Sequence, residues 1–161
     1  MPISDYLANL RSRIGNDLIL MPGVNAIVFN DAGEVLLQHA HDGRWYTPGG
    51  AMDPHEQPAD ACAREVLEES GLVVEPQRLV GIFTEAPVTY PNGDVVQYVA
   101  IAFACRVTGG TLKVADEESL DMRFFPIDRL PPLREDQRER LQQAMMGMSG
   151  LFKSNGLWRG A

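Results

Sequence analysis

Apolar and polar residues alternate along this 161-residue chain in two rhythms, one typical of helices and one typical of strands. Residues 4–15 carry apolar side chains at helical spacing, which predicts a short N-terminal helix with Ser4 as its N-cap and Gly15 at its end. Short apolar runs bounded by Gly, Pro, Asn or Asp predict strands. These runs cover residues 24–29, 35–39, 79–89, 95–107 and 122–125.

A second helix is predicted for residues 59–70, which are good helix formers. Pro58 suits the first turn of this helix, where an N–H group has no intrahelical partner, and Gly71 suits its C-cap. The apolar positions of the helix form a stripe that we expect to pack on a sheet. The stripe consists of Ala59, Cys62, Ala63, Val66 and Leu67.

The remaining signals concern chain breaks and a closing helix. We expect Pro22 and Gly23 to break the chain, and residues 109–110 to form a turn. Residues 135–146 predict a closing helix whose charged side chains form an exposed, salt-bridged face. That face includes Arg134, Glu135, Asp136, Arg138, Glu139 and Arg140.

Chain length and element order together predict a single α/β domain over residues 1–161. It contains the N-terminal helix at 4–15, a core over about residues 24–147 and a loosely held tail at 148–161. Together these elements predict a mixed β-sheet packed with two or three helices. With 45% hydrophobic and 22% charged residues, the composition is that of a globular domain and excludes disorder, collagen and coiled coil.

The charge balance narrows the range of partners. The chain has 22 Asp and Glu against 14 Lys and Arg, which gives a formal net charge of −8. Long nucleic acids and anionic membranes attract proteins through a cationic face, so we expect neither as a partner. The same charge raises a question about small phosphate substrates, because an acidic protein should repel them.

The cysteines and the N-terminus indicate a cytoplasmic protein. Cys62 and Cys105 are too few for a disulfide scaffold and too far apart in the sequence for a CxxC metal site. Buried free thiols are the simplest interpretation, and they suit a reducing cytosol. The first residues lack the basic and apolar regions of a signal peptide, and the longest apolar run is far too short to cross a bilayer.

Three glutamates in the second helix carry the strongest chemical signal. Glu65, Glu68 and Glu69 stand at positions i, i+3 and i+4, so their carboxylates project from one face. Like charges this close destabilise an isolated helix by roughly 0.2–0.5 kcal/mol per pair. A divalent cation explains the cluster, since carboxylate oxygens suit Mg²⁺ or Mn²⁺. The alternative is a solvated acidic face.

The spacing around these glutamates is specific. Gly50 is followed after five residues by Glu56 and, after seven more, by the run REVLEESGL at residues 64–72. This segment resembles the Nudix box, the signature of the Nudix (MutT-like) hydrolase family, at every specified position. The seven fixed letters coincide by chance on the order of once in 10⁸ placements.

The resemblance extends over about residues 24–130. Residues 45–50 (WYTPGG) resemble the W-x-L-P-G-G lead-in of the family, and residues 116–128 resemble its acidic turn and the strand that follows. Thr47 and His55 depart from the family pattern, and we expect them to affect loop shape and substrate fit rather than metal binding. The resemblance implies a Nudix-type α/β/α sandwich with a mixed β-sheet.

The resemblance also implies a metal site and its ligands. The expected cofactor is Mg²⁺, for which Mn²⁺ can substitute. The expected ligands are the main-chain carbonyl of Gly49 and the carboxylates of Glu65, Glu68, Glu69 and Glu118. The base for the attacking water is either Glu65 or a glutamate outside the box. Glu117 is the fallback for Glu118, and a solvent-exposed turn is the alternative interpretation of both.

Neighbouring residues are expected to support the carboxylates and the substrate. Glu56 should orient the helix by pairing with Arg64. Arg44, Trp45 and Tyr46 are candidates for a phosphate contact beside a base-stacking wall. Core packing is the alternative for Trp45.

These features predict a Mg²⁺-dependent pyrophosphohydrolase that cleaves the phosphoanhydride of a nucleoside diphosphate linked to another group X. A small nucleotide derivative is the expected substrate, and homodimerisation fits the family. The alternatives are a nucleotide-sensing domain without catalysis and an RNA 5′-end pyrophosphohydrolase, although the latter needs a basic channel. Of the 22 acidic residues, six lie in segment 50–72 and four in 116–121, so a cation is required to bridge protein and phosphate.

Overall fold

The structure is a computed structural model that describes residues 4–115, 119–155 and 157–160. A mixed β-sheet forms its centre, as the sequence predicts, and this sheet has eight strands. In this sheet β1 (Ile19–Phe29) runs parallel to β7 (Val95–Gly110), and the other pairs are antiparallel. The remaining strands are β2 (Val35–Ala40), β3 (Trp45–Tyr46), β4 (Gly49–Ala51), β5 (Leu72–Thr84), β6 (Val88–Thr89) and β8 (Ser119–Phe125).

The helices begin and end close to the positions that the sequence predicts. They are α1 (Asp5–Ile14), α2 (Pro58–Ser70) and α3 (Glu135–Met145), with a 3₁₀ turn at Ile127–Arg129. Ser4 caps α1 by accepting a hydrogen bond from the Leu7 N–H, and Gly71 ends α2 in the left-handed conformation at φ 69°. None of the helices in the described residues is long and apolar enough to cross a membrane.

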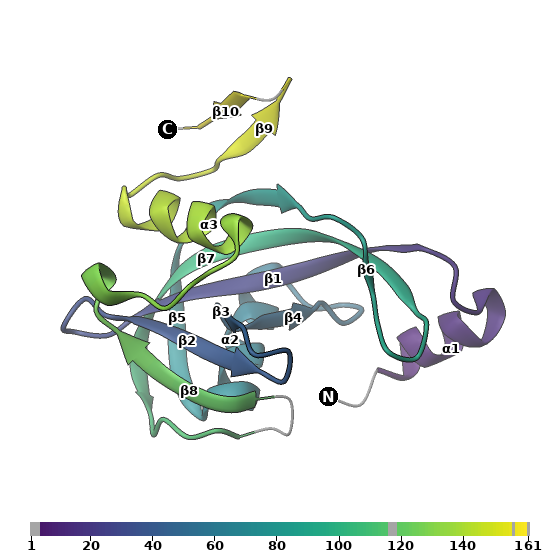
Figure 1. Cartoon of the computed structure of the whole chain (residues 1–161), viewed down its shortest axis with the longest axis horizontal. Coiled ribbons are helices and arrows are strands. Elements are labelled where there is room, and N and C mark those ends of the chain that lie inside the picture. Colours follow the sequence, from purple (N-terminus) through teal and green to yellow (C-terminus); the bar gives the residue numbers. More distant parts are fainter. Residues whose placement is uncertain (1–3, 116–118, 156, 161) are drawn as a thin grey trace.

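Alternating side chains of the sheet build two cores. Ala26 and Val28 of β1 point to a cluster that includes Val66 of α2, whereas Ile27 points to a cluster that includes Leu141 of α3. Figure 1 shows α2 and α3 on opposite sides of the sheet. The molecule is therefore the α/β/α sandwich that the sequence predicts.

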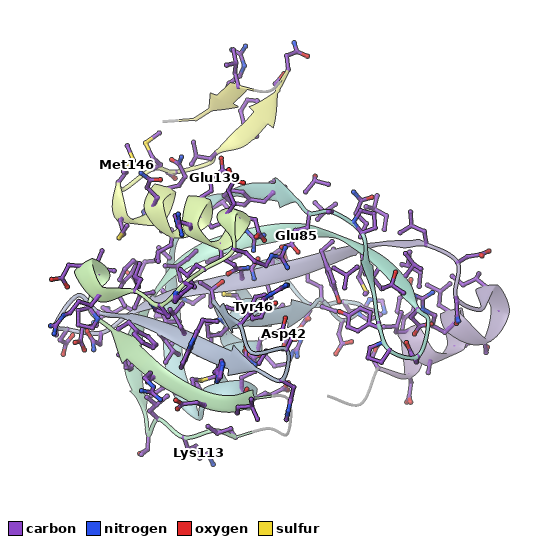
Figure 2. The ribbon with its side chains drawn as sticks, in the orientation of Figure 1. Asp42, Tyr46, Glu85, Lys113, Glu139 and Met146 are labelled. Carbon is purple, nitrogen blue, oxygen red and sulfur yellow. The ribbon has the colours of Figure 1, made fainter. Side chains whose placement is uncertain are left out.

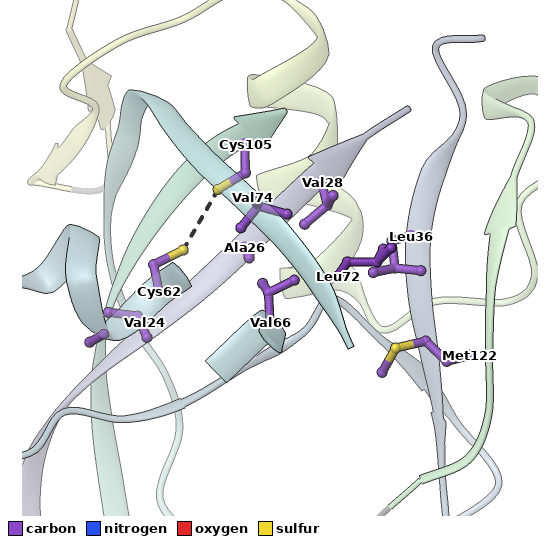
Figure 3. Packing of buried hydrophobic residues seen from close by; sticks show 11 residues of the cluster. Val24, Ala26, Val28, Leu36, Cys62, Val66, Leu72, Val74, Cys105 and Met122 are labelled. Atoms are coloured by element: carbon purple, nitrogen blue, oxygen red, sulfur yellow. Dashed lines mark hydrogen bonds between the residues drawn. The ribbon is translucent and has the colours of Figure 1, made fainter. Parts of the chain in front are cut away.

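The core under α2 contains both cysteines. Cys62 of α2 and Cys105 of β7 lie with their Sγ atoms 3.7 Å apart, and both are free thiols buried among aliphatic side chains (Figure 3). Their contact packs α2 against β7 of the sheet. The structure thus agrees with the expectation of buried free thiols.

Two predicted chain breaks lie inside strands. Pro22 and Gly23 belong to β1 and pair with Val99 and Ala100 of β7. Pro22 offers no N–H, but its carbonyl accepts a hydrogen bond of 3.2 Å from Met52, so the strand continues through it. Residues 109–110 extend β7 against the start of β5 instead of forming a turn.

The buried faces of two helices differ from the predicted ones. In α2, Leu67 of the predicted stripe is exposed, whereas Glu65 and Glu69 are buried. The rim of the sheet at β4 contacts this face of α2, so carboxylates occupy positions that pattern alone assigns to apolar residues. In α3, Gln137 and Arg140 are buried, so the predicted exposed face was wrong at Arg140.

The tail after α3 begins with residues that are bound to the sheet edge. Leu151 is buried, and its N–H and C=O bond to Val80 and Ile82 of β5 at 2.9 Å each. Beyond it, β9 (Phe152–Ser154) and β10 (Leu157–Arg159) form a hairpin that projects from the body (Figure 1).

Candidate functional site

The three glutamates of α2 lie in different environments. The side chain of Glu65 is 1% exposed, Glu69 is buried, and Glu68 is 45% exposed and lines a cavity. All three line that cavity, which has a volume of about 830 Å³. The helix therefore brings the predicted carboxylates to one wall.

Glu65 is a buried carboxylate with incomplete hydrogen bonding. Its Oε1 accepts a hydrogen bond of 2.9 Å from Arg64, while Oε2 has no hydrogen-bond partner among the described residues. Burial raises the pKa of Glu65 to about 6, and the charge of Arg64 acts in the opposite direction. A buried oxygen without a partner is costly unless a ligand completes it.

Two glycines of β4 form the opposite wall. Gly49 and Gly50 pair with Asn25 and Val24 of β1, which holds their backbone beside α2. The Gly49 N–H donates a hydrogen bond of 3.1 Å to Oε2 of Glu69. These contacts place bare backbone, with no side chain, against the carboxylates.

Arg64 links the carboxylates to one another. Its guanidinium donates to Glu56 at 3.1 and 2.8 Å, to Glu65 at 2.9 Å and to Glu68 at 3.3 Å, and it also reaches the Ala51 carbonyl. The expected pair of Glu56 and Arg64 is thus present. Hydrogen bonds from Arg64 hold the pKa of Glu56 below its usual value.

The donor atoms around the carboxylate wall fit the implied metal, although they do not form a finished site. In the described part of the chain, no three His, Cys, Asp or Glu side chains converge as a ready-made metal site. Arg64 explains this, because it binds Glu65 and Glu68 while Glu69 turns to the Gly49 N–H. The oxygen donors nevertheless suit a divalent cation, as does Oε2 of Glu65, which has no partner in the part of the chain that the structure describes. To bind a cation, Glu65 and Glu68 need only replace their hydrogen bonds from Arg64 with contacts to the cation.

Helix α1 and the β6–β7 turn form the outer wall of the large cavity. Arg11 fastens them together by donating a 2.9 Å hydrogen bond to the Val95 carbonyl and by an ion pair of 3.4 Å with Asp94. Leu7 and Tyr90 line the cavity from these two elements. The sequence pattern gave no signal for this wall, because it forms between segments about 80 residues apart.

A smaller cavity of about 210 Å³ adjoins the first. The two cavities share Gly49, Gly50, Glu69, Tyr90 and Tyr98 in their linings. The hydroxyl groups of Tyr90 and Tyr98 lie 2.9 Å apart in a hydrogen bond. These shared residues lie between the two cavities, and Glu69 is the glutamate that lines both.

The predicted substrate residues are dispersed. Trp45 stacks on His39 with ring centroids 4.7 Å apart and packs edge-on against Phe125, and it lines neither cavity. Trp45 is thus partly buried against the core under α3, and its role toward a substrate stays a prediction. Arg44 is exposed beside Asp42, while Tyr46 lines the smaller cavity and donates a 2.6 Å hydrogen bond to Asp42 (Figure 2).

The predicted outer carboxylates lie outside the described residues. Glu118 and its fallback Glu117 fall in the gap between residues 115 and 119. Asp121, the next acidic residue, pairs with Arg123 on β8. The role of Glu118 therefore stays a prediction.

Other residues enter the site without a signal in the sequence pattern. Asn25, Glu85, Arg134 and Gln137 line the smaller cavity. Arg140 lies behind them and pairs with Glu85. Alternating charge along α3 suggested an exposed face, and only tertiary packing turns one side of that helix inward.

Comparison with known proteins agrees with this architecture. The NUDIX domain matches residues 19–144. Human 8-oxo-dGDP phosphatase NUDT18 is 40% identical over 119 residues, covering 69% of this chain and 34% of that protein. The ADP-ribose pyrophosphatase of Methanocaldococcus jannaschii is 29% identical over 130 residues, covering 79% and 74% of the two chains.

Solved structures show the same fold. An ADP-ribose pyrophosphatase from Streptococcus suis has a TM-score of 0.62 at 30% identity, covering 79% of this chain and 90% of that one. Across four curated relatives, the human protein among them, this chain spans between 33% and 58% of their length. The domain match covers well over half of the chain, and the protein therefore belongs to the Nudix family.

Proposed function

We propose that this protein is a Mg²⁺-dependent pyrophosphohydrolase that cleaves the phosphoanhydride of a nucleoside diphosphate linked to another group. The observation that carries the proposal is the wall of Glu65, Glu68 and Glu69 beside a cavity of about 830 Å³. One buried oxygen of Glu65 has no hydrogen-bond partner among the residues that the structure describes. Membership of a family whose relatives include pyrophosphatases supports the proposal.

The acidic wall explains the need for a cation. Carboxylates and phosphates repel each other, so a phosphate substrate can approach this wall only with countercharge between them. Glu65, Glu68, Glu69 and the Gly49 carbonyl would hold Mg²⁺, or Mn²⁺ in its place. When bound, the cation neutralises phosphate charge and activates water. Glu118 is our candidate for a further ligand or base.

The chain's own groups then perform the remaining work. Arg64 keeps the carboxylates in place through Glu56. The base that accepts the proton of the attacking water would be either Glu65 or a glutamate outside the motif, such as Glu118. In the reaction, the oxygen of water forms a bond to phosphorus, and the bridging P–O bond of the anhydride breaks. The proton passes to a carboxylate, and two phosphomonoesters leave.

The large cavity supports a small nucleotide derivative as the substrate. Its outer wall of α1 and the β6–β7 turn encloses space beyond the carboxylates for the group attached to the diphosphate. A net charge of −8 argues against a long RNA chain in this space. We also propose the cytoplasm as the compartment, since the free thiols of Cys62 and Cys105 persist in a reducing environment. A homodimer stays a prediction.

A turnover screen tests the proposal. The protein is incubated with Mg²⁺ or Mn²⁺ and with nucleoside di- and triphosphates, dinucleoside polyphosphates and nucleotide sugars, and the products are identified by mass. We expect a nucleoside monophosphate and a second phosphorylated product. Nucleotide binding without any product would instead favour a sensing domain. Turnover of triphosphate or capped oligonucleotides alone would favour the RNA alternative.

A further inference from the structure

Arg140 is a fully buried cation, and the pattern of α3 does not predict this. Its side chain is 1% exposed and lies over the ring of Phe83, 5.4 Å from the ring centroid. A buried guanidinium needs anionic and polar partners to offset its desolvation. Arg140 finds them in Glu85, in Asp136 at 3.2 Å and in Asn25 at 2.6 Å. Side chains from β1, from the residue after β5 and from α3 itself thus converge on one arginine.

Glu85, labelled in Figure 2, directly follows β5 and lines the smaller cavity. Its Oε1 accepts from Arg140, and its backbone is fixed by hydrogen bonds with Tyr98 and Gln97. Within the described residues, Oε2 of Glu85 accepts no hydrogen bond. Arg140 therefore holds a charged acceptor in place, with one oxygen left for a ligand.

The orientations of two amides in the same lining follow from their partners. An arginine can only donate, so the oxygen of Asn25 faces Arg140 and its Nδ2 is left to donate. The oxygen of Gln137 accepts from the N–H and the hydroxyl of Thr47, at 3.1 and 2.9 Å, which leaves its Nε2 as a donor. Besides Glu69, which lines both cavities, and the Arg134 guanidinium, the smaller cavity thus offers the carboxylate of Glu85 as an acceptor and two amides as donors.

We propose that the smaller cavity binds the nucleobase of the substrate and that Glu85, positioned by Arg140, selects a guanine-type base over adenine. This inference rests on the proposed function, because it places the base next to Glu69, the glutamate of the carboxylate wall that lines both cavities. Guanine presents two neighbouring donors, N1–H and the N2 amino group, and two acceptors, O6 and N7. A carboxylate matches the donors, and the amides of Asn25 and Gln137 match the acceptors.

Adenine fits this set poorly. The Watson–Crick edge of adenine carries an acceptor at N1, and a carboxylate oxygen facing that lone pair is repelled. Tyr46 and Tyr98 in the lining can stack on either purine, so they contribute affinity without distinguishing the two. Discrimination therefore depends on the charge and the fixed position of Glu85.

Binding of GMP and AMP, the mononucleotides that differ only in the base, tests the proposal without requiring turnover. Calorimetric titrations with Mg²⁺ present should show that GMP binds about tenfold or more tightly than AMP. In Glu85→Gln, the new amide can donate to N1 of adenine, so the preference should fall to within about threefold or reverse. Glu75→Gln, at an exposed carboxylate on β5, should leave the preference unchanged.

Arg140→Lys tests the positioning role. Lysine keeps the charge but cannot bond to Glu85, Asn25 and Asp136 together, because it lacks the planar fork. The preference for GMP should shrink, and KM for a guanine substrate should rise while kcat at saturation stays within about twofold. Thermal unfolding of each variant checks that it is folded, and Glu85→Gln decides the matter if Arg140→Lys is not.

The outcomes separate this inference from the proposed function. A preference for GMP that Glu85→Gln removes supports the inference, even if no anhydride is ever cleaved. Equal or tighter binding of AMP by the wild-type protein overturns it, and so does an unchanged preference in Glu85→Gln. In those two cases cleavage of a nucleotide anhydride would still uphold the proposed function.

Discussion

The carboxylate of Glu65 lies directly over the backbone of Gly50. A Cβ atom on Gly50 would come within 2.5 Å of Cδ and Oε2 of Glu65, which is closer than real Cβ contacts allow. Gly50 has no left-handed conformation to explain its identity, so this contact is the reason for glycine there. Gly50, the first residue of the sequence motif, must therefore be glycine because the carboxylate of Glu65, 15 positions later in α2, occupies the space of a side chain.

Gly50→Ala should displace Glu65 and disable the site. Because the new methyl group takes the space of the carboxylate, we expect kcat/KM to fall by about 10² or more while the fold is retained. Gly109→Ala is the matched control, since its nearest neighbour would be 3.9 Å away in ordinary contact. Initial rates and circular dichroism of both variants measure the effect. Full activity in Gly50→Ala would show that Glu65 does not act from this position.

Glu56→Gln should make stability less dependent on pH in the acid range. Hydrogen bonds from Arg64, together with the Asp53 N–H, lower the pKa of Glu56 below its usual value of 4.5. The folded protein therefore favours the ionised form, and the resulting stability is present above the unfolded pKa and lost as the pH falls through the folded one. Urea unfolding should show wild type more stable than Glu56→Gln by about 1–3 kcal/mol at pH 7.

The same comparison at low pH provides the control. Below about pH 4 the difference between the two proteins should shrink, because Glu56 becomes protonated in the wild type as well. A difference that stays constant from pH 7 to pH 3 would show that the charge of Glu56 contributes nothing.

Arg11→Ala should weaken substrate binding more than catalysis. Arg11 connects α1 to Val95 and Asp94, and so holds the outer wall of the large cavity far from the carboxylates. We expect KM to rise about tenfold and kcat to change by less than about threefold, because the lost wall contributes binding rather than chemistry. Arg13→Ala, on the exposed side of α1, is the control. A tenfold fall in kcat with an unchanged KM would contradict the assignment of this wall to substrate binding.

Mg²⁺ should stabilise the folded protein by binding the carboxylate wall. At a concentration of 100 times Kd, a ligand specific for the folded state adds about 2.7 kcal/mol. Thermal unfolding should therefore shift upward with Mg²⁺ and return on addition of a chelator. The shift should be much smaller in Glu68→Gln than in Glu75→Gln, which alters an exposed carboxylate on β5. Equal shifts in both variants would place the cation elsewhere.

Much of the fold could be predicted because its signals are local. Ser4, Pro58 and Gly71 mark helix ends through capping chemistry that depends on neighbours in the chain, and the helices begin and end within one residue of the predictions. Pro22 misled because β1 pairs with β7 along its length and the Pro22 carbonyl accepts a hydrogen bond from the Met52 N–H, so the strand tolerates the missing N–H of the proline. Such compensation comes from tertiary contacts, which no local pattern records.

The candidate site shows the same difference between residues with a local sequence signal and residues placed by tertiary contacts. The motif identified Glu65, Glu68 and Glu69 through their spacing, and the structure brings them to one wall. Arg140 and Glu85 were missed, because 55 residues separate them and only the packing of α3 on the sheet joins them. The motif specifies the carboxylate wall, whereas residues scattered along the chain shape the cavities around it.

The most direct test of the central claim is the turnover of the best nucleotide substrate by Glu69→Gln in the presence of Mg²⁺. Glutamine is nearly isosteric and can keep the contact with the Gly49 N–H, so the fold should persist while a ligand charge is lost. We predict that turnover falls by at least about 10³ relative to wild type and to the control Glu75→Gln. Hydrolysis by Glu69→Gln at the wild-type rate would contradict the assignment of this helix as the catalytic wall.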